Sequence, residues 1–189
     1  MNPFRTPGLV VASVIVPLAC LAADPCRSGL NPGQRPGPYA FIVSTGPNRG
    51  KAHCFICEAE NRPMVIVFAR SLNDPTGKLL RQLDQALVEH RQAELRAWAT
   101  FLSDDEPKLR PQVTEWVRKL GLTNLSVGIF EDADGPPTYR LNREADVTVL
   151  LAVRQKVVAN YAYRPGELTE DHIREILLAV PKLLEPATP

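Results

Sequence analysis

The feature that most constrains the fold is a pair of apolar runs near the C-terminus, which only two residues separate. Val147–Val153 and Lys156–Tyr163 are rich in β-branched and aromatic residues, and Arg154-Gln155 joins them. Strands with so short a connection can pair only as an antiparallel hairpin. The chain must therefore contain a β-sheet.

A helix follows the hairpin closely enough to cover that sheet. Thr169 is placed to cap its first turn, and Ile173 and Ile176 recur at helical spacing on one face. Leu168 and Ile173 have the spacing of a hydrophobic staple. Pro181 should end or kink the helix.

A strand, helix and strand lie earlier in the chain. Met64–Arg70 and Leu95–Leu102 are apolar runs typical of buried strands. Between them the spacing predicts a helix over Pro75–His90, with Asp74 as its cap and Pro75 in its first turn. This arrangement indicates a βαβ unit.

Three further elements complete the expected order. They are a strand at Tyr39–Ser44, a helix that begins near Pro111 and stops at Gly121, and a strand at Leu125–Phe130. The acidic segment 131–137 resembles part of a calcium loop, but the later ligands are missing, so we predict a polar turn without metal. The order of elements indicates one α/β domain.

These elements carry a resemblance to a known family. Residues 64–102, together with the hairpin and terminal helix over 147–184, resemble the βαβ and ββα halves of the thioredoxin fold. The stretch Gly50–Cys57, followed by Pro63 and the strand end Phe68–Arg70, is similar to exported thioredoxin-like or peroxiredoxin-like proteins of unassigned function. The resemblance implies a thioredoxin-like domain over residues 39–185, with a central mixed β-sheet flanked by helices.

The resemblance also implies where the thioredoxin cysteines would lie. In that family they occupy the junction between the central strand and the first long helix, where helix amides stabilise a thiolate. Aligning Phe68-Ala69 with the family pattern places Asn73 and Thr76 at the two cysteine positions and Val147 at the proline that faces them. Neither Asn73 nor Thr76 can form a disulfide, so the usual thioredoxin site is absent.

The Cys54-x-x-Cys57 motif lies about one strand earlier, between the first two strands. A thiolate can attack a substrate disulfide, and a second thiol two residues away can resolve the mixed disulfide. We expect Cys54 to attack and Cys57 to resolve, with thiol- or disulfide-containing proteins as partners. Lys51 and His53 would favour the Cys54 thiolate, whereas Glu58 and Glu60 would oppose it, so the expected activation is weak.

Two other roles fit the same cysteines. A closed Cys54–Cys57 disulfide can staple a long loop, in which case the protein is a non-catalytic thioredoxin-fold module that binds a partner. His53 beside the cysteines resembles part of a zinc site, but structural zinc normally needs four ligands and the sequence has no second Cys-x-x-Cys or paired His. We therefore predict no metal and no cofactor, and both the redox and the structural role remain open.

The N-terminus has the pattern of a cleavable signal peptide over residues 1–23. Arg5 precedes an apolar stretch from Leu9 to Leu21, which falls short of the roughly 20 residues that span a bilayer. Lipidation of Cys20 is the alternative, and no stable membrane span is expected. Residues 24–38, rich in Pro and Gly, are predicted to be a flexible lead-in.

Export implies a periplasmic, cell-envelope or extracellular location, where cysteines pair readily. If Cys54 and Cys57 pair, Cys26 is left free or bonded between chains. The formal net charge is only +1, with 22 basic and 21 acidic residues spread along the chain. This balance provides no basic surface for nucleic acid or anionic lipid.

We predict that the mature protein begins at Asp24, because Ala22 and Ala23 follow the apolar stretch at signal-peptidase spacing. N-terminal sequencing of the exported protein should read Asp-Pro-Cys. A lipid-bearing Cys20 as the first residue would instead establish the lipoprotein form.

Overall fold

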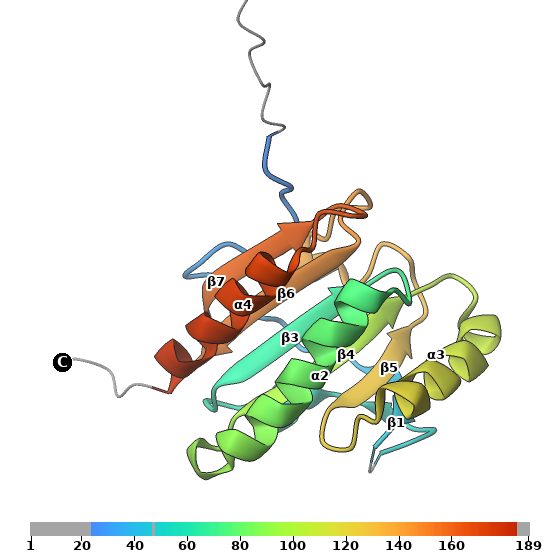
Figure 1. The fold of residues 1–189 in the computed structure, drawn as a ribbon, viewed down its shortest axis with the longest axis horizontal. Coiled ribbons are helices and arrows are strands. Elements are labelled where there is room, and N and C mark those ends of the chain that lie inside the picture. Colours follow the sequence, from blue (N-terminus) through green and yellow to red (C-terminus); the bar gives the residue numbers. More distant parts are fainter. Residues whose placement is uncertain (1–23, 47, 185–189) are drawn as a thin grey trace, which may run out of the picture.

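The computed structural model describes residues 24–46 and 48–184, which form one seven-stranded sheet with helices packed on it (Figure 1). The strand order is β2-β1-β5-β4-β3-β6-β7. The strands are β1 (Phe41–Thr45), β2 (Ala52–His53), β3 (Met64–Ala69), β4 (Arg96–Leu102), β5 (Ser126–Phe130), β6 (Val147–Val153) and β7 (Lys156–Tyr163). The helices are α1 (Phe55–Ala59), α2 (Asp74–Glu89), α3 (Glu106–Leu120) and α4 (Glu170–Ala179).

The centre of the sheet has the pairing that the sequence predicts. β3 is parallel to β4 and antiparallel to β6, and β6 pairs with β7 as the antiparallel hairpin. The two hairpin turn residues, Arg154 and Gln155, both have left-handed backbone, with φ of 52° and 58°. Positive φ at both positions is what a type I′ turn requires. The prediction of an α/β fold with a mixed sheet flanked by helices is confirmed.

The sheet has a core on each face, because every residue of β3 is buried. Val65 and Val67 contribute to the core beneath α2, α3 and α4, which Figure 1 shows on one side of the sheet. Ile66 and Phe68 alternate to the other face, as strand geometry requires. There they meet α1, the chain before β1 and the loop after β5.

The chain before β1 packs on this second face. Residues 24–38 contain no helix or strand, but Leu30 is buried, and the backbones of Gly33 and Gln34 exchange hydrogen bonds with Val157 of β7. The segment thus differs from the flexible lead-in that its composition predicts. A few backbone hydrogen bonds hold this segment to the sheet. The Pro and Gly content of the segment does not predict these hydrogen bonds.

Two helices start elsewhere than predicted. Asn73, not Asp74, caps α2, because its side-chain oxygen accepts a hydrogen bond from the backbone N–H three residues on. α3 begins at Glu106, with Asp105 as its cap, so that Pro111 lies inside the helix. The prediction near Pro111 was wrong because a proline typical of a first turn is here tolerated in the second.

The terminal helix matches its prediction closely. Thr169 caps α4 and forms a reciprocal capping box with His172. Leu168 and Ile173, the two residues with staple spacing, are both buried in the same core. Pro181 follows the α-helix in a short 3₁₀ turn.

The predicted signal peptide and the alternative lipid anchor at Cys20 lie outside the described residues. Within residues 24–46 and 48–184, no helix combines the length and the apolarity that crossing a membrane would require.

We predict that Ile176→Ala lowers the free energy of unfolding by roughly 2–5 kcal/mol, because Ile176 is fully buried under α4 and its truncation leaves a cavity. Leu178→Ala on the same helix is the matched control, because Leu178 is 68% exposed and its truncation should change stability by less than about 0.5 kcal/mol. Urea unfolding of both variants measures the difference, and equal losses would mean that α4 packs through another face.

Candidate functional site

The two motif cysteines form a disulfide at the start of α1. Cys54 and Cys57 are bonded to each other, with their Cα atoms 5.4 Å apart, as the spacing predicts. Cys54 is the N-cap residue, and its Sγ accepts a hydrogen bond from the backbone N–H of Cys57 at 3.2 Å. Cys57 is exposed, whereas Cys54 is half-buried. Of the two bonded cysteines, Cys57 is therefore the more exposed residue.

Aromatic packing holds α1 against the second face of the sheet. The ring of Phe55 stacks on Phe41 at a centroid distance of 5.4 Å and on Trp98 at 5.5 Å. Trp98 is in turn fixed by a hydrogen bond from its Nε1 to the hydroxyl of the buried Tyr39, at 2.8 Å. Ala59 at the other end of α1 is also buried. The helix is thus anchored by contacts that do not involve sulfur.

The basic side chain next to the disulfide interacts with a carboxylate. His53 Nε2 lies 2.8 Å from Glu58 Oε2, and its ring packs edge-on against Phe55. His53 and Glu58, which would act on a Cys54 thiolate in opposite directions, are therefore paired with each other.

A cavity of about 340 Å³ opens beside Cys57, and we call it the Cys57 cavity. Its lining comes from α1, the start of β3, the β6–β7 turn and the chain before β1. The lining residues are Arg35, Pro36, Gly37, Pro38, Ile56, Cys57, Glu60, Met64 and Gln155. Most of them are apolar, and Arg35 and Glu60 carry the charges.

The wall formed by Arg35–Pro38 is fixed on both sides. The hydroxyl of the buried Tyr139 donates a hydrogen bond to the carbonyl of Gly37 at 2.8 Å. The guanidinium of Arg35 donates to the side-chain oxygen of Gln155, in the β6–β7 turn. The cavity is therefore built before any ligand enters.

The usual thioredoxin position, at the other end of β3, is filled by a polar network. Asn73 caps α2 there, and Val147 begins β6 beside Ala69, as the alignment predicts. The buried Asp146 accepts hydrogen bonds from Ser71 Oγ at 2.7 and 2.8 Å and from Asn73 Nδ2 at 2.8 Å. The Asp146 carboxylate, the Ser71 hydroxyl and the Asn73 amide are thus hydrogen-bonded to one another at the position where thioredoxins carry their cysteines.

The disulfide and this polar network lie at opposite ends of the sheet. Met64, the first residue of β3, lines the Cys57 cavity, and Ala69, the last, precedes the network. A strand of this length spans roughly 17 Å. Chemistry at Cys57 would therefore take place at the amino end of the central strand, away from the end that thioredoxins use.

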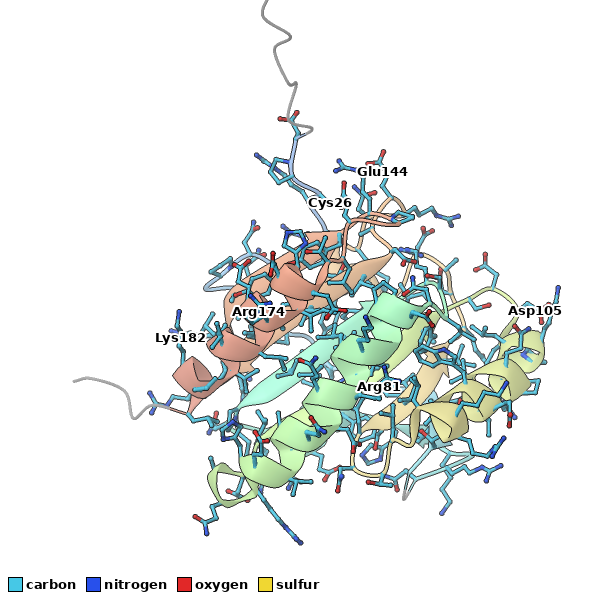
Figure 2. All side chains as sticks on the ribbon, viewed as in Figure 1. Cys26, Arg81, Asp105, Glu144, Arg174 and Lys182 are labelled. Atoms are coloured by element: carbon cyan, nitrogen blue, oxygen red, sulfur yellow. A yellow bond between two sulfur atoms is a disulfide. The ribbon has the colours of Figure 1, made fainter. Side chains whose placement is uncertain are left out.

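The third described cysteine is remote from the disulfide. Cys26 lies beside Glu144 (Figure 2), near Arg164 at the end of β7. Its partial burial raises the pKa of its thiol; Arg164 opposes this rise and the carboxylates of Glu167 and Glu144 add to it. The length of β7 separates Cys26 from the turn that lines the Cys57 cavity, so Cys26 cannot bond to Cys54 or Cys57 within this fold.

Sequence reasoning identified the two cysteines but missed the cavity. Its walls come from segments that are far apart in the chain, so no local sequence motif predicts the cavity. The Pro36-Gly37-Pro38 triplet could have suggested a stiff wall, but the composition around it indicated a flexible segment instead. Among the described residues, no group of three or more His, Cys, Asp or Glu side chains is placed to hold a metal ion.

No family model matches this chain, and no curated protein matches it significantly.

Solved structures, by contrast, share its fold. A candidate protein disulfide isomerase from Bacteroides thetaiotaomicron superposes with a TM-score of 0.64 at 17% identity, covering 84% of this chain and 94% of that one. A candidate thiol:disulfide interchange protein DsbE from Chlorobium tepidum gives 0.59 at 16% identity, covering 80% and 99%. A PrxQ mutant from Xylella fastidiosa gives 0.59 at 13% identity, covering 84% and 100%. The thioredoxin-like fold is therefore confirmed.

We predict that Asp146→Ala lowers the free energy of unfolding by about 1–3 kcal/mol, because Ser71 and Asn73 lose the buried acceptor that satisfies them. Asp171→Ala is the control, because Asp171 is an exposed residue of α4 and should contribute less than about 0.5 kcal/mol. Denaturant unfolding with the disulfide intact measures both. A loss below about 0.5 kcal/mol for Asp146→Ala would show that the network does not support the fold.

Proposed function

We propose that the protein exchanges disulfides with other thiols outside the cytoplasm, using Cys54 and Cys57 as its redox pair. The observation that carries this proposal is that Cys57, an exposed residue, lines a preformed cavity. A redox disulfide must be reachable by an incoming thiolate, whereas a structural disulfide gains nothing from exposure.

The size of the disulfide loop also supports a redox role. The two cysteines are three residues apart, and closing a four-residue loop stabilises a fold by only about 2 kcal/mol in the chain-entropy model. Loops of 100 residues gain about 4.7 kcal/mol in the same model. The aromatic stack around Phe55 already anchors α1. A staple at this point would therefore add little to the fold.

The exchange reaction starts from the disulfide. A partner thiolate attacks one sulfur of the Cys54–Cys57 bond, forms a mixed disulfide with it and releases the other as a thiolate. A second thiolate of the partner then attacks the partner sulfur in the mixed disulfide. This forms a disulfide within the partner and releases the protein as a dithiol. The partner dithiol is oxidised by two electrons and the pair is reduced by two. The reverse sequence reduces a partner disulfide.

The location of this chemistry is part of the proposal. The N-terminal pattern supports export, and an oxidising space would keep the pair closed in the absence of a reductant. Two of the structurally similar proteins bear names that refer to disulfide isomerisation or interchange. We assign the same class of chemistry to this chain, but at a different end of the sheet.

A second function has one observation in its favour. The position that thioredoxins use is closed by Asp146, Ser71 and Asn73, which are hydrogen-bonded to one another. A chain that had lost all exchange chemistry would look the same at that position. In that case the protein would be a binding module and the Cys54–Cys57 bond a structural one.

The reduction potential separates the two functions. We predict a value between about −270 and −120 mV, the range of working oxidoreductases, whereas a structural bond should lie below about −300 mV. Equilibration of the purified mature protein with defined ratios of reduced and oxidised dithiothreitol measures it, with alkylation and mass spectrometry as the readout. A value below about −300 mV would establish the structural bond.

A further inference from the structure

Building on the proposed redox function, we propose that the Cys57 cavity is its substrate subsite. It receives an apolar side chain next to the reactive cysteine of a polypeptide, and Cys57 is the sulfur that bonds to that cysteine. This order of attack is the reverse of the one that the sequence suggests.

The exposures of the two sulfur-bearing residues decide the order. Cys57 is exposed and lines the cavity, while Cys54 is half-buried and does not line it. When a thiolate attacks Cys57, the departing sulfur is that of Cys54, which already accepts the backbone N–H of Cys57. A hydrogen bond to a leaving thiolate stabilises its charge. Attack at Cys57 is therefore favoured both by access and by the leaving group.

The cavity lining selects an apolar side chain. Ile56 and Met64 form its inner surface, and Pro36 and Pro38 add ring carbons without backbone N–H donors. A volume of about 340 Å³ lies at the lower end of the roughly 300–1,000 Å³ typical of ligand sites. A side chain fits this space, whereas a bulky cofactor would exceed it.

Backbone strain marks the same place. Among the described residues, five residues other than glycine have positive φ, and two of them, Glu60 and Gln155, line the cavity. Positive φ is unfavourable for residues that carry a Cβ: at Gln155 the hairpin turn requires it, whereas Glu60, with φ 51° and ψ −115°, lies outside any hairpin turn. Strain of this kind clusters at functional sites. The side chain of Gln155 accepts a hydrogen bond from Arg35 and donates one to Asn61, and these bonds hold the turn in place. The strained turn thus supports the cavity rim.

The charges at the rim favour a polypeptide over a small anionic thiol. Arg35 and Glu60 carry opposite charges, and the side chain of Arg35 is already bound to Gln155. A small thiol with two carboxylates would meet one engaged guanidinium and one carboxylate. A polypeptide segment brings no such charge, and burial of its apolar side chain supplies the binding energy.

The first test asks which cysteine bonds to the substrate. The oxidised mature chain carrying Cys26→Ser reacts with a cysteine peptide and is quenched with acid, and mass mapping shows which cysteine of the pair carries the peptide. We expect at least tenfold more adduct on Cys57 than on Cys54. Equal amounts, or more adduct on Cys54, would overturn the assignment of Cys57.

The second test measures side-chain preference. Two peptides with a single Cys, flanked by Leu in one and by Ser in the other, reduce the oxidised protein in separate stopped-flow experiments. We expect the Leu peptide to react at least tenfold faster in the wild type. In Ile56→Asp the ratio should fall towards one, because the new carboxylate lies in the cavity wall. Leu178→Asp, the same kind of change on exposed α4, should keep the wild-type ratio.

Dithiothreitol serves as a further reductant that separates the possible failures. If neither peptide nor dithiothreitol reduces the pair, the redox function itself is wrong. If both peptides react at equal rates in the wild type, the pair is a redox centre but the cavity is not its subsite. Because the wild-type ratio alone decides this, an Ile56→Asp protein that fails to fold does not rescue the proposal.

Discussion

The structure depends on the burial of β3 on both of its faces. All six of its residues are excluded from solvent, and a strand buried on both sides requires two separate covers. One cover is regular, because α2, α3 and α4 lie together on one side of the sheet (Figure 1). The other is irregular and consists of α1, the chain before β1 and the loop after β5. The disulfide belongs to this second cover.

This placement gives the molecule two chemically different ends. At the carboxyl end of β3, Asp146 satisfies Ser71 and Asn73, and the network leaves no sulfur where the fold commonly carries one. At the amino end, α1 presents Cys57 beside a cavity. The same fold can therefore carry a disulfide at the opposite end of its central strand, because the fold fixes the strands and not the site.

The irregular cover is held in place by hydrogen bonds that its composition does not predict. Hydroxyl groups carried by the aromatic core are the main connectors: Tyr39 accepts from Trp98, and Tyr139 donates to Gly37. Burial raises the pKa of both phenols far above their usual value, so they remain neutral hydrogen-bonding groups. A wall of Pro and Gly residues pinned in this way can form one side of a binding cavity.

Local patterns in the sequence were sufficient for the regular part of the structure. The two-residue connection at Arg154-Gln155 determined the hairpin, and the apolar periodicity determined α2 and α4, because both depend on neighbours in the chain. Helix starts were less certain where two capping residues compete, as Asn73 and Asp74 do. The spacing of Cys54 and Cys57 was likewise enough to predict their bond.

Only the tertiary structure decided what surrounds that bond. The cavity brings Arg35, Ile56 and Gln155 together from positions up to 120 residues apart, and the exposure of Cys57 relative to Cys54 follows from how α1 packs on Trp98. Such features arise from long-range packing, for which the sequence carries no local pattern. The sequence by itself determined the fold class and the disulfide pair, and the packing decided that Cys57 is the more exposed cysteine and lines a cavity.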